Sequence, residues 1–224
     1  MPGTLFKSRI IYLLAGIVIL PALFLCVIIA ATLIAADERM FEESLPVDEN
    51  NNLYNHSLNN YIELGDETFF RFFKNRNPEM NDNYLRTIIG IYKAECKSEN
   101  ISAASAFCQM CHETNFLRYG GTVRAYQYNF AGIGSTSSRE RGAKFPDIST
   151  GIRAHIQHIK AYSSDEDPVN EIVDPRFSLV KRKSAYGIMD LTGKWAADPN
   201  YGKKILIYIM ELYSYGNITD IKND

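Results

Sequence analysis

The chain has 224 residues, of which 46% are hydrophobic and 22% charged, a composition typical of a globular domain with additional segments. A formal net charge of −2 excludes a strongly basic protein whose overall charge would attract nucleic acid. The four cysteines include one C-x-x-C pair, Cys108 and Cys111, but lack the second ligand pair of a structural zinc site. We therefore expect no metal, no cofactor and no nucleic-acid partner.

The first predicted element is a membrane helix. Residues 10–36 contain no charged side chain. This run exceeds the roughly 20 apolar residues that span a bilayer and the roughly 7–15 of a cleavable signal. Lys7 and Arg9 precede it and acidic residues follow it, which places the N-terminus in the cytoplasm and the rest of the chain outside. We expect residues 1–36 to form a cytoplasmic stub and anchor; cleavage after Ala36 is the alternative.

Residues 37–65 predict a flexible linker. They are rich in asparagine and acidic residues and contain few large apolar side chains. Such a segment buries too little surface to offset the entropy lost on ordering. We therefore expect the functional domain to comprise residues 66–224.

Helical periodicity dominates this domain. Helices are expected over residues 67–75, 81–95, 101–115, 151–162 and 201–216. The glycine-rich residues 119–147 between the third and fourth helices predict loops with a short hairpin, and long ordered loops are usually functional. Cys108 and Cys111 fit the buried pattern of the third helix; a disulfide from Cys96 to one of them is the alternative in an exported domain.

Glu113 is the only side chain of the third helix that is formally charged at neutral pH. Ser105 and Gln109 share its face, which is small and polar and therefore lines a groove or packs against another element. The negative end of the helix dipole and partial burial should both raise the pKa of Glu113, as a general acid requires. The alternative is an ordinary helix-end glutamate bonded to Arg118 or Arg124.

The strings FCQMCHETNFLRYGG and YNFAGIG resemble the bacterial glucosaminidase family (glycoside hydrolase family 73), endo-β-N-acetylglucosaminidases that act on peptidoglycan. KWAADPNYGKKI resembles the D-P-x-Y that precedes the last helix of that family, with Tyr201 as its tyrosine. The similarity covers roughly residues 85–212. It implies a mainly helical, lysozyme-like α+β fold, in which a helical lobe and a small β-lobe or long loop region flank a sugar-binding groove.

The resemblance also implies roles for individual residues. Glu113 would protonate the glycosidic oxygen of the β-1,4 bond between N-acetylglucosamine and N-acetylmuramic acid, and Tyr201 would orient the substrate or stabilise charge. The expected substrate-binding residues are Gln109, Thr114, Tyr128, Asn129, Phe130 and Gly132. Glu140 is the expected second carboxylate; Asp147 or the 2-acetamido group of the substrate are alternatives. Glu140 as a solvated loop residue and Asp147 as a helix cap are the competing interpretations.

Other candidates have weaker patterns. We expect Trp195 to be buried beside Ala196 and Ala197, with a sugar platform as the alternative. His155 and His158 have the spacing of a metal-ligand pair, but no acid completes a site, so we expect core or surface roles.

The sequence thus predicts a peptidoglycan hydrolase that is anchored in a bacterial cell membrane by a single helix, with an extracytoplasmic catalytic domain and glycan strands as partner. A lytic transglycosylase that forms 1,6-anhydro products and a non-catalytic wall-binding protein on the same fold are the alternatives.

Overall fold

The computed structural model describes Ile28, Thr32 and residues 54–135 and 141–216. No helix in this part of the chain has the length and apolar character needed to cross a membrane. The expected anchor lies outside the described residues, apart from Ile28 and Thr32. The contacts reported below belong to the unit that begins at Asn55.

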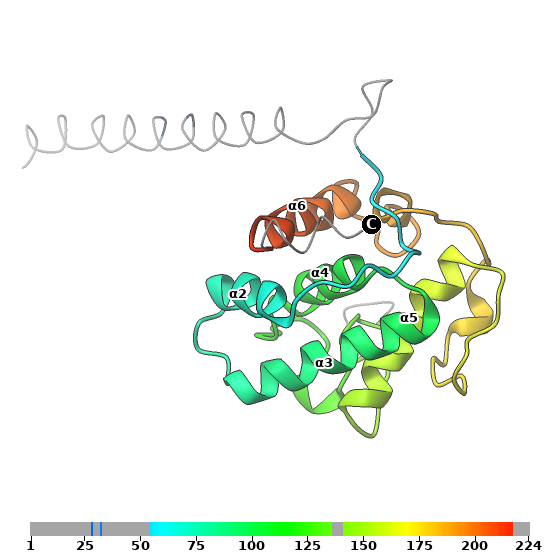
Figure 1. Ribbon diagram of the computed structural model, residues 1–224. Helices are drawn as coiled ribbons and strands as arrows, with labels where there is room; N and C mark the ends of the chain where they lie inside the picture. The colour runs from blue at the N-terminus through cyan, green and yellow to red at the C-terminus, as the bar shows by residue number, and fades with distance from the viewer. Residues whose placement is uncertain (1–27, 29–31, 33–53, 136–140, 217–224) are drawn as a thin grey trace, which may run out of the picture. The chain divides into compact units, whose positions relative to one another are not determined.

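In the described residues of this unit, five α-helices form the frame, and short 3₁₀ turns lie in the connections from α4 to α5 and from α5 to α6 (Figure 1). The helices are α2 (Asp66–Arg76), α3 (Asp82–Glu99), α4 (Ala103–Thr114), α5 (Ile148–Ser163) and α6 (Tyr201–Ser214), and the turns are η1 (Ala125–Gln127), η2 (Phe177–Leu179) and η3 (Ile188–Leu191). All five predicted helices are confirmed. The side chains of Asn81, Ser102 and Asp147 cap the starts of α3, α4 and α5 by accepting hydrogen bonds from backbone N–H groups.

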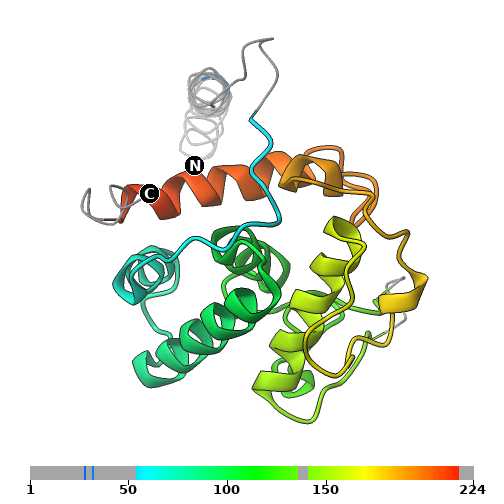
Figure 2. The ribbon, with the colours of Figure 1, turned by 45° about the vertical axis from the view of Figure 1, so that its right-hand side comes forward.

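Helix α4 is the central element. It packs against α6 on one side and against α3 and α5 on the other (Figures 1 and 2). Every residue from Ala103 to Cys111 is buried, so the small polar face packs against other elements along most of its length. Cys96, Cys108 and Cys111 are buried free thiols, which confirms their core role and rules out the alternative disulfide.

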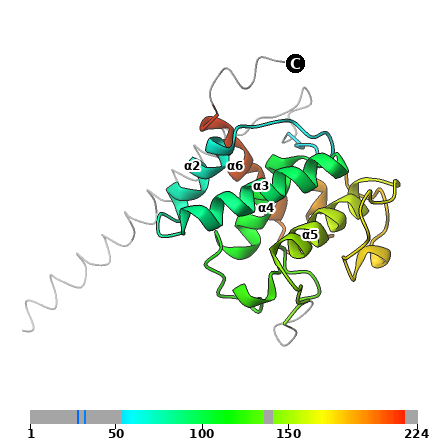
Figure 3. The same cartoon turned by 60° about the horizontal axis from the view of Figure 1, so that its bottom comes forward.

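The insertion between α4 and α5 is irregular (Figure 3). In the described residues, β-pairing is limited to three isolated bridges, none of them within this insertion, so the expected hairpin is not seen there. Side chains replace a strand ladder: the Asn129 amide donates to the carbonyls of Ile133 and Ala143. The Gln127 amide likewise donates to the carbonyl of Arg141. The domain is therefore mainly helical, with a long loop region where a β-lobe was the alternative.

Residues 55–65, the N-terminal strap, differ from the flexible linker that we expected there. Leu58 and Leu64 are buried in the core. Leu58 N donates to Tyr186 O, and Ser102 N donates to Leu58 O. The average polarity of this segment did not reveal its two buried leucines. Its polar groups also form hydrogen bonds with the rest of the domain. The domain therefore begins near residue 55 rather than 66.

Candidate active site

Glu113 lines a cavity of about 560 Å³, a size typical of ligand sites. Residues from α4, the insertion after it, α5 and two later loops enclose it. The lining residues are Glu113, Tyr119, Gly121–Val123, Ala131–Ser135, His158, Tyr162, Arg176 and Lys194–Ala197. Among these described lining residues, Glu113 is the only carboxylic acid.

The backbone that follows Glu113 is strained. Asn115, Phe116 and Leu117 have φ angles of 50°, 52° and 59°, a left-handed conformation that is uncommon for residues other than glycine. The Thr114 hydroxyl stabilises this turn because it donates to Met110 O and accepts from Leu117 N. Thr114 is buried and supports the turn, and its expected role in substrate binding stays a prediction.

The Glu113 carboxyl receives hydrogen bonds from neutral donors. The Tyr201 hydroxyl donates to Oε1 at 2.5 Å. Burial raises the pKa of Glu113 to about 7, while hydrogen bonds from Tyr201 and Trp195 oppose the shift. Arg118 and Arg124 donate to backbone carbonyls instead, so the interpretation of Glu113 as an ion-paired glutamate is wrong.

A buried chain of hydrogen bonds continues behind Tyr201. Gln109 Nε2 donates to the Tyr201 hydroxyl at 2.8 Å, and Gln109 Oε1 lies 3.1 Å from His155 Nε2. Because an amide oxygen only accepts, His155 carries its proton on Nε2, and its Nδ1 accepts from the Tyr92 hydroxyl at 2.9 Å. Burial lowers the pKa of His155 to about 3, so this ring is neutral. Every donor in the chain therefore points toward Glu113.

This arrangement shows where two of the expected site residues lie. Gln109 is fully buried and lies behind Tyr201. Tyr201 is 2% exposed, does not line the cavity and contacts Glu113 directly. Substrate binding by Gln109 and the two expected roles of Tyr201 stay predictions, and stabilisation of charge is the role of Tyr201 that fits this position.

In the loop with the sequence YNFAGIG, most of the expected site residues are buried inside the domain and do not line the cavity. Asn129 is fully buried and holds the loop backbone, and Phe130 packs edge-on against Tyr92 in the core. Tyr128 is half-buried and lies outside the lining. None of these three residues lines the cavity, and their expected role in sugar binding stays a prediction. Gly132 does line the cavity, and a Cβ there would lie 3.4 Å from Glu113 Oε2.

No second carboxylate is found among the described residues that line the cavity. Glu140 lies outside the described residues and stays a prediction. Asp147 caps α5, is exposed and does not line the cavity, which favours its interpretation as a cap.

Two residues that line the cavity, Trp195 and His158, were not predicted as site residues from the sequence. Trp195 is half-buried rather than buried, and its ring borders the cavity 4.8 Å from the ring of His158. Its position fits the alternative role as a sugar platform. His158 also lines the cavity, whereas His155, three residues earlier on α5, supports Glu113 from behind. A histidine within an apolar helix signals a buried polar partner, but spacing alone does not identify that partner.

Comparison with known proteins agrees with this geometry. Residues 89–214, more than half of the chain, match the Glucosaminidase family, described as mannosyl-glycoprotein endo-beta-N-acetylglucosaminidase. The matched region includes α4, the loop with Gly132 and Tyr201. A protein of Borreliella burgdorferi, described only as uncharacterized, is 45% identical over 141 residues, which are 63% of this chain and 69% of that relative.

Proposed function

Because the chain belongs to the glucosaminidase family and is therefore a glycoside hydrolase, we propose that Glu113 is its general acid and cleaves the β-1,4 bond of N-acetylglucosamine in peptidoglycan strands. The observation that carries this role is a carboxyl group that borders a sugar-sized cavity and is held only by neutral donors. With a pKa of about 7, it retains a proton to donate at neutral pH. Peptidoglycan is the substrate class that the family relationship supports.

The two carboxyl oxygens have different tasks. Tyr201 donates to Oε1, and we assign the acidic proton to Oε2, which lies on the Gly132 side. This proton passes to the glycosidic oxygen as the bond from that oxygen to C1 breaks, and the leaving sugar departs as an alcohol. In hydrolysis, water then adds to C1 and gives up a proton to a base, for which Glu140 is the predicted residue.

A lytic transglycosylase is the second candidate, because Glu113 is the only carboxylic acid among the described lining residues. In that reaction the bond cut is the one at C1 of N-acetylmuramic acid: Glu113 protonates the departing oxygen, the 6-hydroxyl of the same N-acetylmuramic acid adds to this C1, and its proton returns to Glu113, which leaves a 1,6-anhydro end. One acid/base residue is sufficient for this chemistry.

Digestion of isolated peptidoglycan by the full-length protein in detergent tests these candidates. With ¹⁸O-labelled water, mass spectrometry should find labelled reducing ends after hydrolysis and unlabelled 1,6-anhydro ends after transglycosylation. Binding to peptidoglycan without any released fragment would instead support a non-catalytic wall-binding protein.

We also propose that residues 10–36 anchor the enzyme in the bacterial cell membrane with its catalytic domain outside. The positive charges before this run and the acids after it support this orientation. A reporter fused after Asp224 should be active only outside the cytoplasm, and retention of Met1 in the membrane fraction would distinguish an anchor from a cleaved signal.

A further inference from the structure

The catalytic cavity has a second chemical feature, a cluster of basic side chains. Arg176, Lys194 and His158 all line it. Glu113 is the only acid among the described lining residues, and with a pKa of about 7 it is largely neutral below that pH. The cavity therefore presents an excess of positive charge, which favours an anionic ligand.

Two members of this cluster already have close partners. Lys194 Nζ donates to Ser184 O at 2.6 Å, and His158 Nδ1 lies 2.6 Å from Asp174 Oδ2. The Arg176 guanidinium has no hydrogen-bond or ion-pair partner in the described part of the chain, although the side chain is only half-exposed. A guanidinium can bind a carboxylate through two parallel hydrogen bonds, so it is the member best able to hold an external anion.

The backbone of Arg176 is fixed rather than free. Its N–H donates to Asp174 Oδ1 at 2.9 Å, and Asp174 is itself buried. Gln157 Oε1 on α5 accepts from the N–H groups of Val173 and Asp174 at 2.8 and 3.2 Å. These bonds position Arg176 before any ligand arrives, which lowers the entropic cost of binding.

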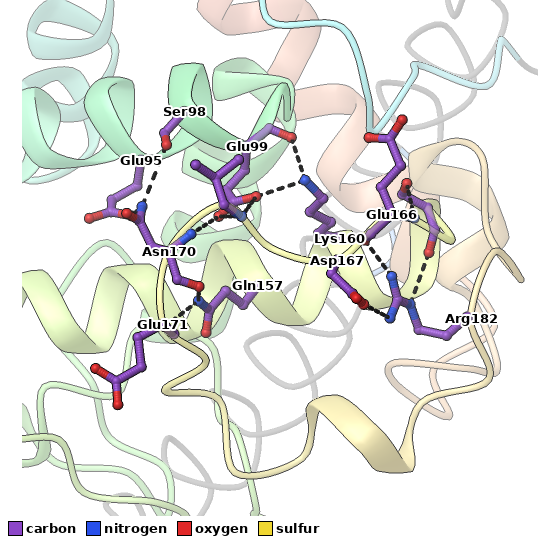
Figure 4. Close-up of polar contacts among 12 residues, drawn as sticks. Glu95, Ser98, Glu99, Gln157, Lys160, Glu166, Asp167, Asn170, Glu171 and Arg182 are labelled. Carbon is purple, nitrogen blue, oxygen red and sulfur yellow. Dashed lines mark hydrogen bonds and ion pairs between the residues drawn. The ribbon is translucent and has the colours of Figure 1, made fainter.

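The preceding loop is held by α3 and α5 (Figure 4). Glu99 at the end of α3 accepts from Val169 N and Asn170 N, and its carboxylate is 2.8 Å from Lys160 Nζ on α5. Gln157 Nε2 adds a bond to Glu171 O at 2.8 Å. A buried ion pair contributes little net stability by itself, but it does favour one conformation of the loop that it holds.

We propose that Arg176 forms an anion subsite of the substrate cavity and binds a carboxylate carried by the glycan strand. The proposal rests on the proposed function, because it places the strand in the cavity beside Glu113. N-acetylmuramic acid supplies such a carboxylate from its lactyl group after peptide removal, and an intact stem peptide supplies others. Both sources offer the same planar anion, whereas an N-acetylglucosamine polymer such as chitin offers none.

Binding measurements can separate these ligands. Full-length protein with Glu113→Gln, which should bind glycan without cutting it, is titrated with three ligands: a neutral N-acetylglucosamine oligomer, strands stripped of peptide, and strands with stem peptides. Addition of Arg176→Gln should lower the affinity for a carboxylate-bearing ligand about 10- to 100-fold relative to the neutral oligomer, the range of a charge-assisted hydrogen bond. The ligand that loses affinity identifies the source of the carboxylate.

Arg86→Gln provides the matched control, since Arg86 is an exposed arginine of α3 that pairs with Glu67. It should leave the ratio of affinities unchanged. Equal losses for all three ligands, unaltered affinities or failure to bind any of them would overturn the Arg176 subsite. Cleavage by the wild type is assayed separately: Arg176-dependent binding without cleavage would refute the proposed function and leave the subsite standing.

Discussion

Two glutamates of this protein occupy nearly the same local position in different helices. Glu99 is the last residue of α3, and Glu113 is the penultimate residue of α4. Each helix ends in a left-handed asparagine, Asn100 with φ 55° and Asn115 with φ 50°. The negative end of a helix dipole acts on both carboxyl groups, so this position alone does not distinguish them.

Their partners distinguish them. Glu99 is buried against the ammonium group of Lys160 and two backbone N–H groups, whereas Glu113 meets the Tyr201 hydroxyl and the Trp195 side chain. A charged partner fixes Glu99 as part of the scaffold. Neutral partners and access to a cavity leave Glu113 with a raised pKa and a transferable proton.

The largest expected effect concerns Glu113. Glu113→Gln keeps the shape of the side chain but removes its proton, so glycan cleavage should fall by roughly 10²–10⁴ or more. Circular dichroism should show a normally folded protein. A folded variant that retains near-normal cleavage would contradict the assignment of the general acid and erase the distinction between the two glutamates.

The next largest effect concerns the Glu99–Lys160 pair and should appear in the free energy of unfolding rather than in catalysis. Lys160→Met leaves the buried Glu99 carboxylate without its cation and should lower the free energy of unfolding by about 3–5 kcal/mol. Urea denaturation measures this loss. In the double variant with Glu99→Gln, part of the stability should return, and a double variant as unstable as the single one would show that the pair is not the source.

The raised pKa of Glu113 should also make the free energy of unfolding depend on pH. The folded-state pKa of Glu113, about 7, lies above its ordinary value of 4.5, so the folded state binds the proton more tightly between these values. Stability should therefore fall as pH rises from 4.5 to 7, by roughly 3 kcal/mol relative to Glu113→Gln. Unfolding of both proteins at several pH values tests this; parallel curves would indicate an unshifted pKa.

A smaller change is expected from Tyr201→Phe, which removes the hydroxyl that donates to Glu113. That bond lowers the pKa of Glu113, so its loss should move the alkaline limb of the activity profile to higher pH. Cleavage near neutral pH should drop about tenfold, the cost of a bond to a charged group. An unmoved limb would mean that Tyr201 acts on the substrate instead.

The smallest expected effect concerns His155, which does not reach the cavity lining. His155→Phe removes the donor that fixes the Gln109 amide, so Gln109 can turn its oxygen toward Tyr201 and compete for the hydroxyl proton. We expect about a threefold loss of kcat, small beside the loss of the acid itself, and an alkaline limb shifted as in Tyr201→Phe. His155→Gln, which restores a donor, should recover part of both; a stability loss without a shifted limb would indicate packing alone.

The sequence predicted the helices and the acid because both depend on local features. Periodicity and caps such as Asn81 and Ser102 mark the helix starts, and the resemblance identified Glu113 and Gly132. The contacts that support the acid could not be predicted from local patterns, because Gln109 and His155 meet across 46 positions of the chain. Arg176 carried no pattern at all, because only the folded loop brings it to the cavity.

The N-terminal strap has a mechanical consequence. A pulling force that enters from the N-terminal side first meets two isolated bridges, Ser57 with Gly187 and Asn59 with Ile101, and the buried side chains of Leu58 and Leu64. Isolated bonds of about 1 kcal/mol each yield one after another, unlike a helix packed along its length. The bond from Ser102 N to Leu58 O then delivers the load to the first turn of α4, the helix that ends at the acid. Under tension, the strap should therefore detach before the helices around the cavity separate, so the geometry at Glu113 should persist after the first bonds have broken.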